Sequence, residues 1–363
     1  MSDRAYDELG PEKVLELHSA KTGLSAIVVV DNTALGPAIG GVRVSPSVGR
    51  AELLRLARTM TLKNSIAGLP HGGGKAGIIA DPDDPQKESY FRIFSRQIRC
   101  LYEYIPGPDM GSNEEAMAWI YDEIKRAVGL PEEIGGIPLD KLGATGFGLS
   151  ICAETAARHA GFDLKGARVA IQGFGSVGKA AARFLSEKGA IIIAASDTGG
   201  TIYDPGGLDI KELLETKESH RSVAKYKKGT VKSLEEIFSL DTDILIPAAT
   251  PDVIHKGNVD TVRARLVLQG ANIPITKDAE ETLHRKGILT VPDFIANAGG
   301  VIMAAMEYAR KSVEEAFDAI ESRIKANTSL ILEKSGSEKI VPRQAAVEIA
   351  KERVLKAMKY RGY

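Results

Sequence analysis

Two spacings of apolar residues alternate along the first third of the 363-residue chain. Runs rich in β-branched residues at 24–32 and 76–81 predict strands, and the pattern over 50–64 predicts a helix. Ser112-Asn113-Glu114-Glu115 has the form of a capping box, so a second helix is expected from there to about Val128. This part of the chain therefore predicts a mixed α/β domain.

The rest of the chain repeats a strand–helix alternation. Short apolar runs at 168–173, 190–196, 243–249 and 266–272 are typical of parallel strands that are buried on both faces. Helical segments lie between several of them, which predicts an α/β fold with a doubly wound, Rossmann-type sheet. Pro342 stands at the first position of a last helix, which we expect to pack on the first domain.

A glycine-rich stretch with two prolines, 131–148, separates the two patterns and predicts the hinge between domains. We place the first domain at 1–134, joined by the last helix at about 335–363. The second domain takes 135–334. A chain of this length ordinarily forms more than one core, which agrees with two domains.

Composition narrows the classes of function. Hydrophobic residues make up 44% of the chain. The net charge of the chain is −1, so no basic face for nucleic acid is expected. No apolar run is long enough to span a membrane, and the acidic, mixed N-terminus is unlike a targeting peptide. Cys100 and Cys152 are far apart and lack metal-ligand spacing, so we expect no metal and a reduced, cytoplasmic setting.

A dinucleotide motif follows the run at 168–172. Its six residues precede a helical pattern, and Asp197 ends the next strand about 20 residues on. Glycines permit a tight turn and close backbone approach, while a helix N-terminus stabilises pyrophosphate. Asp197 can accept hydrogen bonds from ribose hydroxyls and would repel a 2′-phosphate, so NAD is expected, with NADP possible. The motif residues are Gly173, Phe174, Gly175, Ser176, Val177 and Gly178.

Two lysines in the first domain are candidates for chemistry. Lys63 continues the apolar face that Leu53, Leu56 and Met60 form at helical spacing, where a lysine can also simply reach out to solvent. Lys75 follows three glycines and begins a buried strand. Burial there would lower the pKa of Lys75 towards neutrality and allow it to act as a general base.

Asp109 completes the constellation from a turn before the predicted helix at 112–128, a position that also suits a purely structural turn aspartate. Two lysines and an aspartate suit one type of reaction. One cation holds a carboxylate, one amine cycles protons, and the acid serves the leaving amine.

These residues lie in motifs that resemble the glutamate/leucine/phenylalanine/valine dehydrogenase superfamily over almost the whole chain. Nine motifs occur in order. They are GPAIGGVR (36–43), MTLKNSIAGLPHGGGKAGI (60–78), GPDMGSNEEAMAW (107–119), GATGFG (143–148), QGFGSVG (172–178), ASDTGG (195–200), PAAT (247–250), QGAN (269–272) and NAGGV (297–301).

The resemblance implies a substrate and oligomerisation domain, a dinucleotide-binding domain and a cleft between them. It implies that Lys63 binds the substrate α-carboxylate, that Lys75 activates water for attack on an iminium intermediate, and that Asp109 transfers the amino proton. It also implies cofactor contacts in the second domain. Thr145 and Asn297 would orient the carboxamide, Asn272 would contact the nicotinamide ribose, and Ala249 would lie beside the cofactor.

The residues of the motifs do not all indicate the same substrate. The glutamate branch of the family has a lysine, a glutamine and a serine where this chain has Ile39, Met60 and Ala304. We therefore expect oxidative deamination of an apolar L-amino acid, branched-chain or aromatic, as in the leucine/valine/phenylalanine-type enzymes, and glutamate second. The segments 203–209 and 346–362 are nevertheless more similar to the glutamate branch. The pocket residues that the resemblance implies are Ile39, Gly41, Gly107, Val301 and Ala304.

Two other classes of protein compete with this interpretation. One is an inactive dinucleotide-binding sensor, which would not need Lys63, Lys75 and Asp109 together. The other is a malic-enzyme-like or hydroxy-acid oxidoreductase, which usually needs a histidine or metal-binding carboxylates that show no grouping here. We therefore expect an L-amino acid, its 2-oxo acid and ammonium as ligands, and a homo-oligomer.

Overall fold

The computed structural model describes residues 6–362, and the chain divides into two compact units. Unit 1 comprises Met1–Leu139, Val301–Ala319 and Val347–Tyr363, and unit 2 comprises Asp140–Gly300 and Ile320–Ala346. The first boundary falls inside the glycine-rich stretch at 131–148. The segment Val301–Ala319 belongs to unit 1, although the sequence pattern groups it with the second domain.

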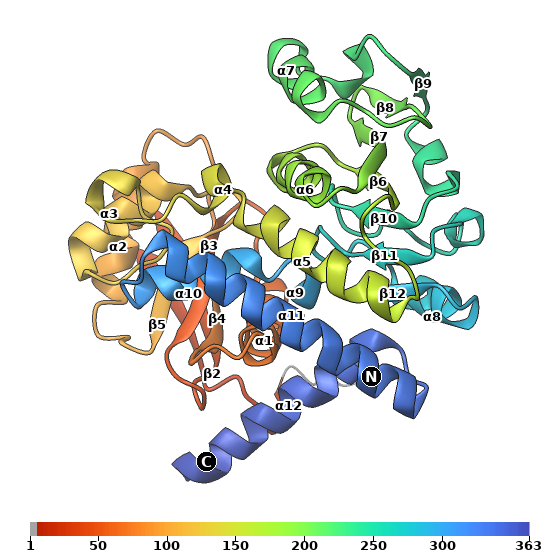
Figure 1. Ribbon diagram of the computed structural model, residues 1–363. Coiled ribbons are helices and arrows are strands. Elements are labelled where there is room, and N and C mark those ends of the chain that lie inside the picture. The colour runs from red at the N-terminus through yellow and green to blue at the C-terminus, as the bar shows by residue number, and fades with distance from the viewer. Residues whose placement is uncertain (1–5, 363) are drawn as a thin grey trace. The chain divides into compact units, whose positions relative to one another are not determined.

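Unit 1 is built on a five-stranded sheet in the order β1-β2-β4-β3-β5 (Figure 1). β1 and β2 pair antiparallel, as do β2 and β4, whereas β3 is parallel to both β4 and β5. The strands are β1 (Lys13–Ser19), β2 (Leu24–Asn32), β3 (Ala38–Val44), β4 (Gly72–Ile78) and β5 (Tyr104–Pro108).

Helices cover both faces of this sheet because the central strands are apolar on both sides. Val28 belongs to one core cluster with Phe91 of α2 (Lys87–Gln97) and Met117 of α3 (Glu114–Ile124). The adjacent Val29 belongs to another cluster, with Leu53 of α1 (Arg50–Ile66). Consecutive strand residues point to opposite faces, so α1 lies on one face and α2 and α3 lie on the other.

The strand at 24–32 is confirmed, but two local predictions differ from the structure. β4 starts at Gly72 rather than Ala76, so all three glycines lie inside the sheet. The N-cap of α3 is Asn113, whose side chain accepts a hydrogen bond from Ala116 N at 3.0 Å. Ser112, the predicted cap, instead accepts a hydrogen bond from Asp109 N, and α3 ends at Ile124.

Unit 2 contains a seven-stranded sheet in the order β12-β11-β10-β6-β7-β8-β9. In this order, the strands from β12 through β11, β10 and β6 to β7 are parallel to one another. β8 pairs antiparallel with both β7 and β9. This topology confirms the predicted Rossmann-type fold. The strands are β6 (Arg168–Gln172), β7 (Ile191–Asp197), β8 (Gly200–Tyr203), β9 (Thr230–Lys232), β10 (Ile244–Pro247), β11 (Leu266–Leu268) and β12 (Leu289–Val291).

The remaining helices connect these strands or follow them. None of the helices in the described part of the chain is long and apolar enough to cross a membrane. They are α4 (Leu139–Leu142), α5 (Ala144–His159), α6 (Ser176–Glu187), α7 (Ile210–His220), α8 (Lys277–Arg285), α9 (Asp293–Ala296), α10 (Gly299–Tyr308), α11 (Val313–Glu338) and α12 (Pro342–Arg361), with short 3-10 turns at Glu132–Ile134, Val223–Lys225, Glu235–Ser239 and Val259–Thr261.

Candidate active site

Lys75 lies in the middle of β4, and its ammonium group is paired with Asp109. The Nζ of Lys75 is 2.9 Å from the Oδ2 of Asp109, and the two side chains are only 9% and 17% exposed. β4 is an inner strand of the sheet, between β2 and β3, which explains the burial of Lys75. The structure thus brings together two of the three residues that the sequence singled out.

Arg43 is a third member of this cluster, and the sequence analysis missed it. The guanidinium of Arg43 donates from Nε to Asp109 Oδ2 at 3.0 Å and also pairs with Glu52 of α1. The signal was present in the sequence. Arg43 is two residues from Gly41 in β3, so the two positions share one face of the sheet.

Gly41 leaves the space in which this cluster forms. A Cβ atom at position 41 would lie 2.7 Å from the Cβ of Asp109 and 3.3 Å from the Nζ of Lys75. Gly107 is paired with Gly41 across β3 and β5, and a Cβ atom at position 107 would lie 3.1 Å from the Cγ2 of Val128. Glycine at position 41 is therefore a requirement of the Lys75–Asp109 contact.

The charged groups of the cluster shift one another's pKa values. Burial lowers the pKa of Lys75, and the positive charge of Arg43 lowers it further, which together outweigh the opposing effect of Asp109. Burial opposes ionisation of Asp109, but Lys75 and Arg43 hold the pKa of that carboxyl below its ordinary value. Because Arg43 stays charged, Asp109 keeps a cationic partner when Lys75 gives up its proton.

Lys63 lies in the last turn of α1 and is half-buried. The predicted apolar face through Leu56 and Met60 is wrong, because the buried stripe contains Leu53, Ala57, Thr61 and Asn64. Small and polar side chains are buried there since α1 packs closely on the glycines of β4. The Nδ2 of Asn64 donates to Gly72 O at 2.6 Å, and a Cβ at Gly73 would lie 2.0 Å from Thr61 N.

The other predicted pocket residues also fall in unit 1. Ile39 in β3 is 4% exposed and Ala304 in α10 is 8% exposed, whereas Val301 is half-buried. Glu307, three residues after Ala304, accepts hydrogen bonds from the backbone N–H groups of Leu130 and Ile137, both at 3.1 Å. Burial raises the pKa of Glu307. The segment that carries Val301 and Ala304 is thus fixed to the end of the first continuous stretch of unit 1.

The glycine loop of unit 2 has the geometry of a phosphate cradle. It follows β6, at the point where neighbouring strands continue on opposite sides of the sheet, and it ends at the N-terminus of α6. Gly173 has φ +95° and packs on Ala249, where a Cβ would be 2.6 Å from the backbone N. A Cβ at Gly178 would be 1.9 Å from Gly173 O, whereas Gly175 faces open space.

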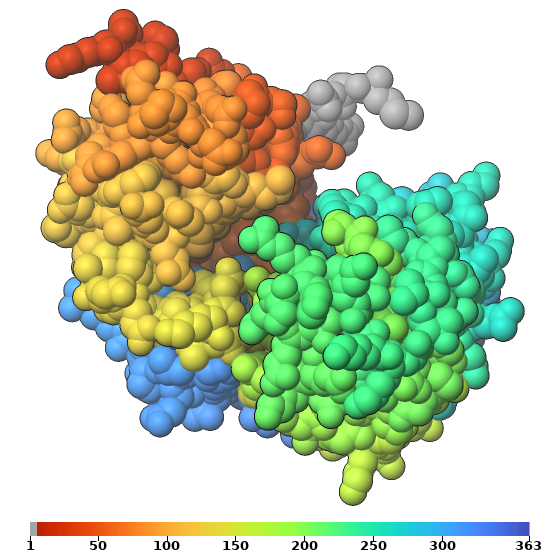
Figure 2. All heavy atoms as spheres, turned by 90° about the horizontal axis from the view of Figure 1, so that it is seen from above, coloured from red at the N-terminus to blue at the C-terminus, as the bar shows by residue number. Residues whose placement is uncertain are grey.

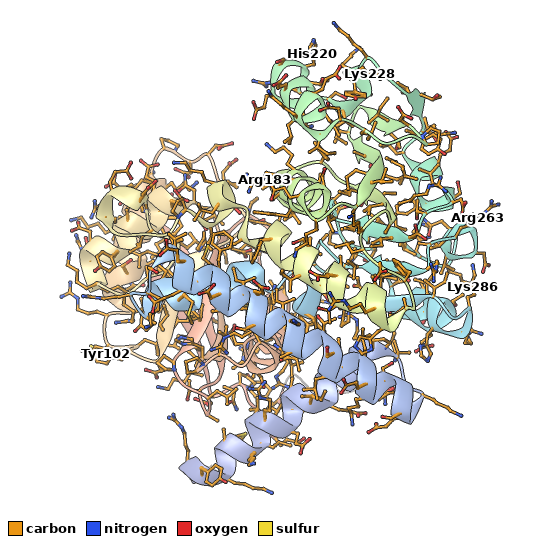
Figure 3. All side chains as sticks on the ribbon, in the orientation of Figure 1. Tyr102, Arg183, His220, Lys228, Arg263 and Lys286 are labelled. Atoms are coloured by element: carbon orange, nitrogen blue, oxygen red, sulfur yellow. The ribbon has the colours of Figure 1, made fainter. Side chains whose placement is uncertain are left out.

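A cavity of about 590 Å³ lies beside this loop and is large enough for part of a dinucleotide. Gly173, Phe174, Gly175, Asp197 and Ala249 are among the residues that line it, and the ring of Phe174 is buried. Ser176 is exposed and Val177 half-buried at the start of α6, from which Arg183 also projects (Figure 3). These residues fit an NAD(P) molecule with its pyrophosphate at the loop.

Asp197 ends β7 as predicted, but its carboxylate already has four donors. Oδ2 accepts from Lys217 Nζ and Val223 N, each at 2.7 Å. Oδ1 accepts from Gly199 N at 2.8 Å and Ser222 Oγ at 3.1 Å. A carboxylate offers about four lone-pair positions, so the ribose hydroxyls have no free one here. Lys217 also neutralises the charge that was expected to repel a 2′-phosphate.

Lys217 and Ser222 lie on the segment that follows β8, which is green in the space-filling view and forms part of the surface of unit 2 (Figure 2). Burial opposes ionisation of Asp197, but Lys217 and the backbone donors outweigh it, so the pKa of Asp197 is lowered. Asp197 is therefore ionised at neutral pH, with its Oδ2 2.7 Å from the Nζ of Lys217.

Three further predicted cofactor residues come together at another part of unit 2. The Nδ2 of Asn297 donates to Asn272 Oδ1 at 3.0 Å. A Cβ at Gly299, two residues after Asn297, would be 3.1 Å from the Cα of Thr145 at the start of α5. Residues from the start of α5, the loop after β11 and the end of α9 thus meet in one region.

A Rossmann-type unit and a lysine–aspartate pair in an α/β unit define a two-domain oxidoreductase. Comparison with known proteins places the chain within that class. Residues 135–362 match the family model described as Glutamate/Leucine/Phenylalanine/Valine dehydrogenase, and residues 11–126 match Glu/Leu/Phe/Val dehydrogenase, dimerisation domain. The chain belongs to this family and is an NAD(P)-dependent amino-acid dehydrogenase, which excludes the inactive sensor and the hydroxy-acid oxidoreductase.

Curated relatives match over most of their length. The chain is 41% identical to a glutamate dehydrogenase of Aeropyrum pernix, with 92% of this chain and 85% of the relative covered. It is 39% identical to an NADP-specific glutamate dehydrogenase of Saccharolobus shibatae (91% and 84%) and 37% identical to an NAD-specific glutamate dehydrogenase of Staphylococcus aureus (92% and 85%). These relatives carry glutamate names rather than leucine or phenylalanine names.

Solved structures extend the range of named substrates. A hetero-hexameric glutamate dehydrogenase from Thermus thermophilus, in a leucine-bound form, is similar with a TM-score of 0.85 and 30% identity, covering 97% of this chain and 90% of that one. L-Tryptophan dehydrogenase from Nostoc punctiforme is similar with a TM-score of 0.78 and 28% identity, covering 96% and 97%. The same fold therefore serves acidic and aromatic substrates in other proteins.

Proposed function

We propose that the chain catalyses the reversible NAD(P)-dependent oxidative deamination of L-glutamate to 2-oxoglutarate and ammonia. The observation that carries this proposal is the similarity to glutamate dehydrogenases of three organisms over at least 91% of the chain. In the same proposal the protein works as a homo-oligomer, because residues 11–126 match a dimerisation domain.

The residues of unit 1 have separate roles in this reaction. Lys63 binds the α-carboxylate of the substrate. Lys75, whose pKa burial lowers, takes a proton from the water that attacks the Cα of the iminium formed from the substrate. Asp109, held by Lys75 and Arg43, transfers the proton to and from the amino group.

The residues of unit 2 bind the cofactor. Gly173–Gly178 hold the pyrophosphate at the N-terminus of α6, and Asp197, Lys217 and Ala249 line the adjacent cavity. Thr145 and Asn297 orient the carboxamide, and Asn272 contacts the nicotinamide ribose. When bound, NAD(P) supplies the acceptor for the hydride that leaves the substrate Cα.

An apolar amino acid is the second candidate substrate, and one observation favours it. Ile39, which stands where the resemblance places the lysine for the side-chain carboxylate of glutamate, is buried at 4% exposure. A buried carboxylate without a partner costs several kcal/mol, so glutamate requires a cation from another segment. An aliphatic or aromatic side chain requires none.

Initial rates separate the two substrates. NADH and NADPH formation would be followed with L-glutamate, L-leucine, L-valine and L-phenylalanine, and the reverse reaction with each 2-oxo acid and ammonium. The proposal expects the largest kcat/KM with glutamate. An advantage of an apolar amino acid by about 10²-fold, the size expected for an unpaired buried charge, would replace it with the second candidate.

The variant Ile39→Lys makes the comparison sharper. If an apolar amino acid is the substrate, the added cation should lower kcat/KM for leucine and raise it for glutamate, because it pairs with a side-chain carboxylate and is unpaired against an alkyl group. Val42→Ile, a buried apolar change in the same strand, serves as the matched control for packing.

A further inference from the structure

Ile273 has a backbone conformation that a β-branched residue rarely adopts. Its φ is +50°, and it stands between Asn272 and Pro274. Positive φ brings a branched Cβ too close to the neighbouring carbonyl group, and a following proline restricts the backbone further. Such conformations are unfavourable and persist only where surrounding contacts enforce them.

The contacts that enforce it are hydrogen bonds on both sides of Ile273. The N–H of Ile273 donates to Oδ2 of Asp293 at 3.0 Å, and its carbonyl accepts from the N–H of Asp252 at 3.0 Å. Ile273 is 48% exposed, so packing does not hold its side chain. Asp293 is therefore the side chain that fixes this turn.

Asp293 is held in turn by Arg343. The Nη2 of Arg343 lies 2.8 Å from Asp293 Oδ1, and its Nε donates to Glu280 Oε2 at 2.7 Å. Nη2 donates its hydrogen bond to Gln269 Oε1 at 2.8 Å, so its contact with Asp293 Oδ1 is an ion pair without a hydrogen bond. The two carboxylates are 3% exposed, and one guanidinium compensates both. Burial opposes the charge of Arg343, but the two carboxylates outweigh it and raise its pKa.

Asp293 also connects the turn to the second predicted nicotinamide residue. The backbone N–H of Asn297 donates to the carbonyl of Asp293 at 2.8 Å. The side chain of Asn297 reaches back to Asn272 Oδ1 at 3.0 Å. The side chain of Asp293 thus holds the turn next to Asn272, while its backbone carbonyl accepts from Asn297.

We infer that Arg343 and Asp293 are positioning residues that hold Ile273 in its unfavourable conformation and so present Asn272 and Asn297 to the nicotinamide half of the cofactor. The inference rests on the roles proposed above for Asn272 and Asn297. Neither Arg343 nor Asp293 needs to touch the cofactor, because they act through the backbone of the turn.

The first test compares two ligands in Asp293→Ala and Arg343→Met. NADH binding is followed by nicotinamide fluorescence. ADP, which lacks nicotinamide and its ribose, is titrated as a competitor for the adenosine half. The expected result is an NADH Kd at least about tenfold weaker, the effect of losing a charge-assisted hydrogen bond, with the ADP Kd unchanged within about twofold. Equal weakening of both ligands, or of neither, would overturn the inference.

The second test is a rescue by glycine. Glycine adopts φ +50° without strain. With Ile273→Gly, the turn should therefore keep its conformation even when the side chain of Asp293 is lost. The double variant Asp293→Ala/Ile273→Gly should recover most of the NADH affinity that Asp293→Ala loses. A double variant that binds NADH no better than Asp293→Ala would contradict a role through Ile273. Arg343→Met keeps Asp293 in place and serves as the independent variant if Asp293→Ala does not fold.

These binding measurements are independent of the substrate. If the wild-type protein bound NADH but deaminated no amino acid, the proposed function would fail while the difference between NADH and ADP could still be measured. If deamination were normal and the two ligands responded alike, the positioning role alone would fail.

Discussion

The Nζ of Lys75 and Oδ2 of Asp109 are 2.9 Å apart, and the same carboxylate oxygen also accepts from Arg43 at 3.0 Å. One oxygen thus serves two cations in a buried cluster. This arrangement keeps Asp109 ionised while it makes the charged form of Lys75 less favourable. It gives the two groups different tasks although they are in direct contact.

The first prediction concerns pH. Because the base form of Lys75 is needed for deamination, kcat/KM should rise with pH through the pKa of Lys75, which is lowered from its ordinary value of 10.5. Arg43→Gln removes a positive charge beside Lys75, so its pKa should rise and the ascending limb should move to higher pH. Arg50→Gln, an exposed change, is the control. An unmoved or acid-shifted limb in Arg43→Gln would contradict the assigned coupling.

The second prediction concerns Gly41. In Gly41→Ala, the added Cβ would lie 2.7 Å from the Cβ of Asp109, so the Lys75–Asp109 contact must shift. Since misplacement by about 1 Å can cost about 10²-fold in rate, kcat should fall by a factor of that order while the Kd for NADH stays constant. Gly49→Ala meets nothing within 4 Å and should keep normal activity. Full activity in Gly41→Ala would show that the contact is not needed.

The third prediction concerns cofactor choice. Lys217 neutralises Asp197, so the wild-type protein should use NAD and NADP with kcat/KM values within about tenfold of each other. Lys217→Met leaves the carboxylate without its ion-pair partner, and binding of NADP should weaken much more than binding of NAD. Lys211→Met, an exposed change on the same helix, should alter neither. Strong preference for NAD in the wild type would mean that Asp197 acts as a free charge after all.

The sequence predicts much of this architecture because local patterns carry it. The strand at 24–32 is apolar on both faces, and the glycine loop stands between a strand and a helix with Asp197 after the next strand. Lys75 could be identified as a candidate because it follows three glycines, and Asp109 because it lies in a turn between Gly107 and Gly111.

Other features depend on contacts between distant segments. The buried stripe of α1 contains Thr61 and Asn64 because glycines of β4 approach the helix, and hydropathy alone favours Leu56 and Met60 there. Lys217 reaches Asp197 from α7, and Arg343 reaches Asp293 from the start of α12. The identity of such partners is decided by tertiary packing, so no local spacing shows them.

The most direct test of the account is the turnover of Lys75→Ala with the best amino-acid substrate, measured together with the Kd for NADH. A general base usually contributes roughly 10²- to 10⁴-fold, so turnover should fall by at least about 10²-fold. The Kd for NADH should stay within about twofold, because Lys75 belongs to unit 1 and the glycine loop to unit 2. Turnover within about tenfold of the wild-type value would contradict the assignment of Lys75 as the base.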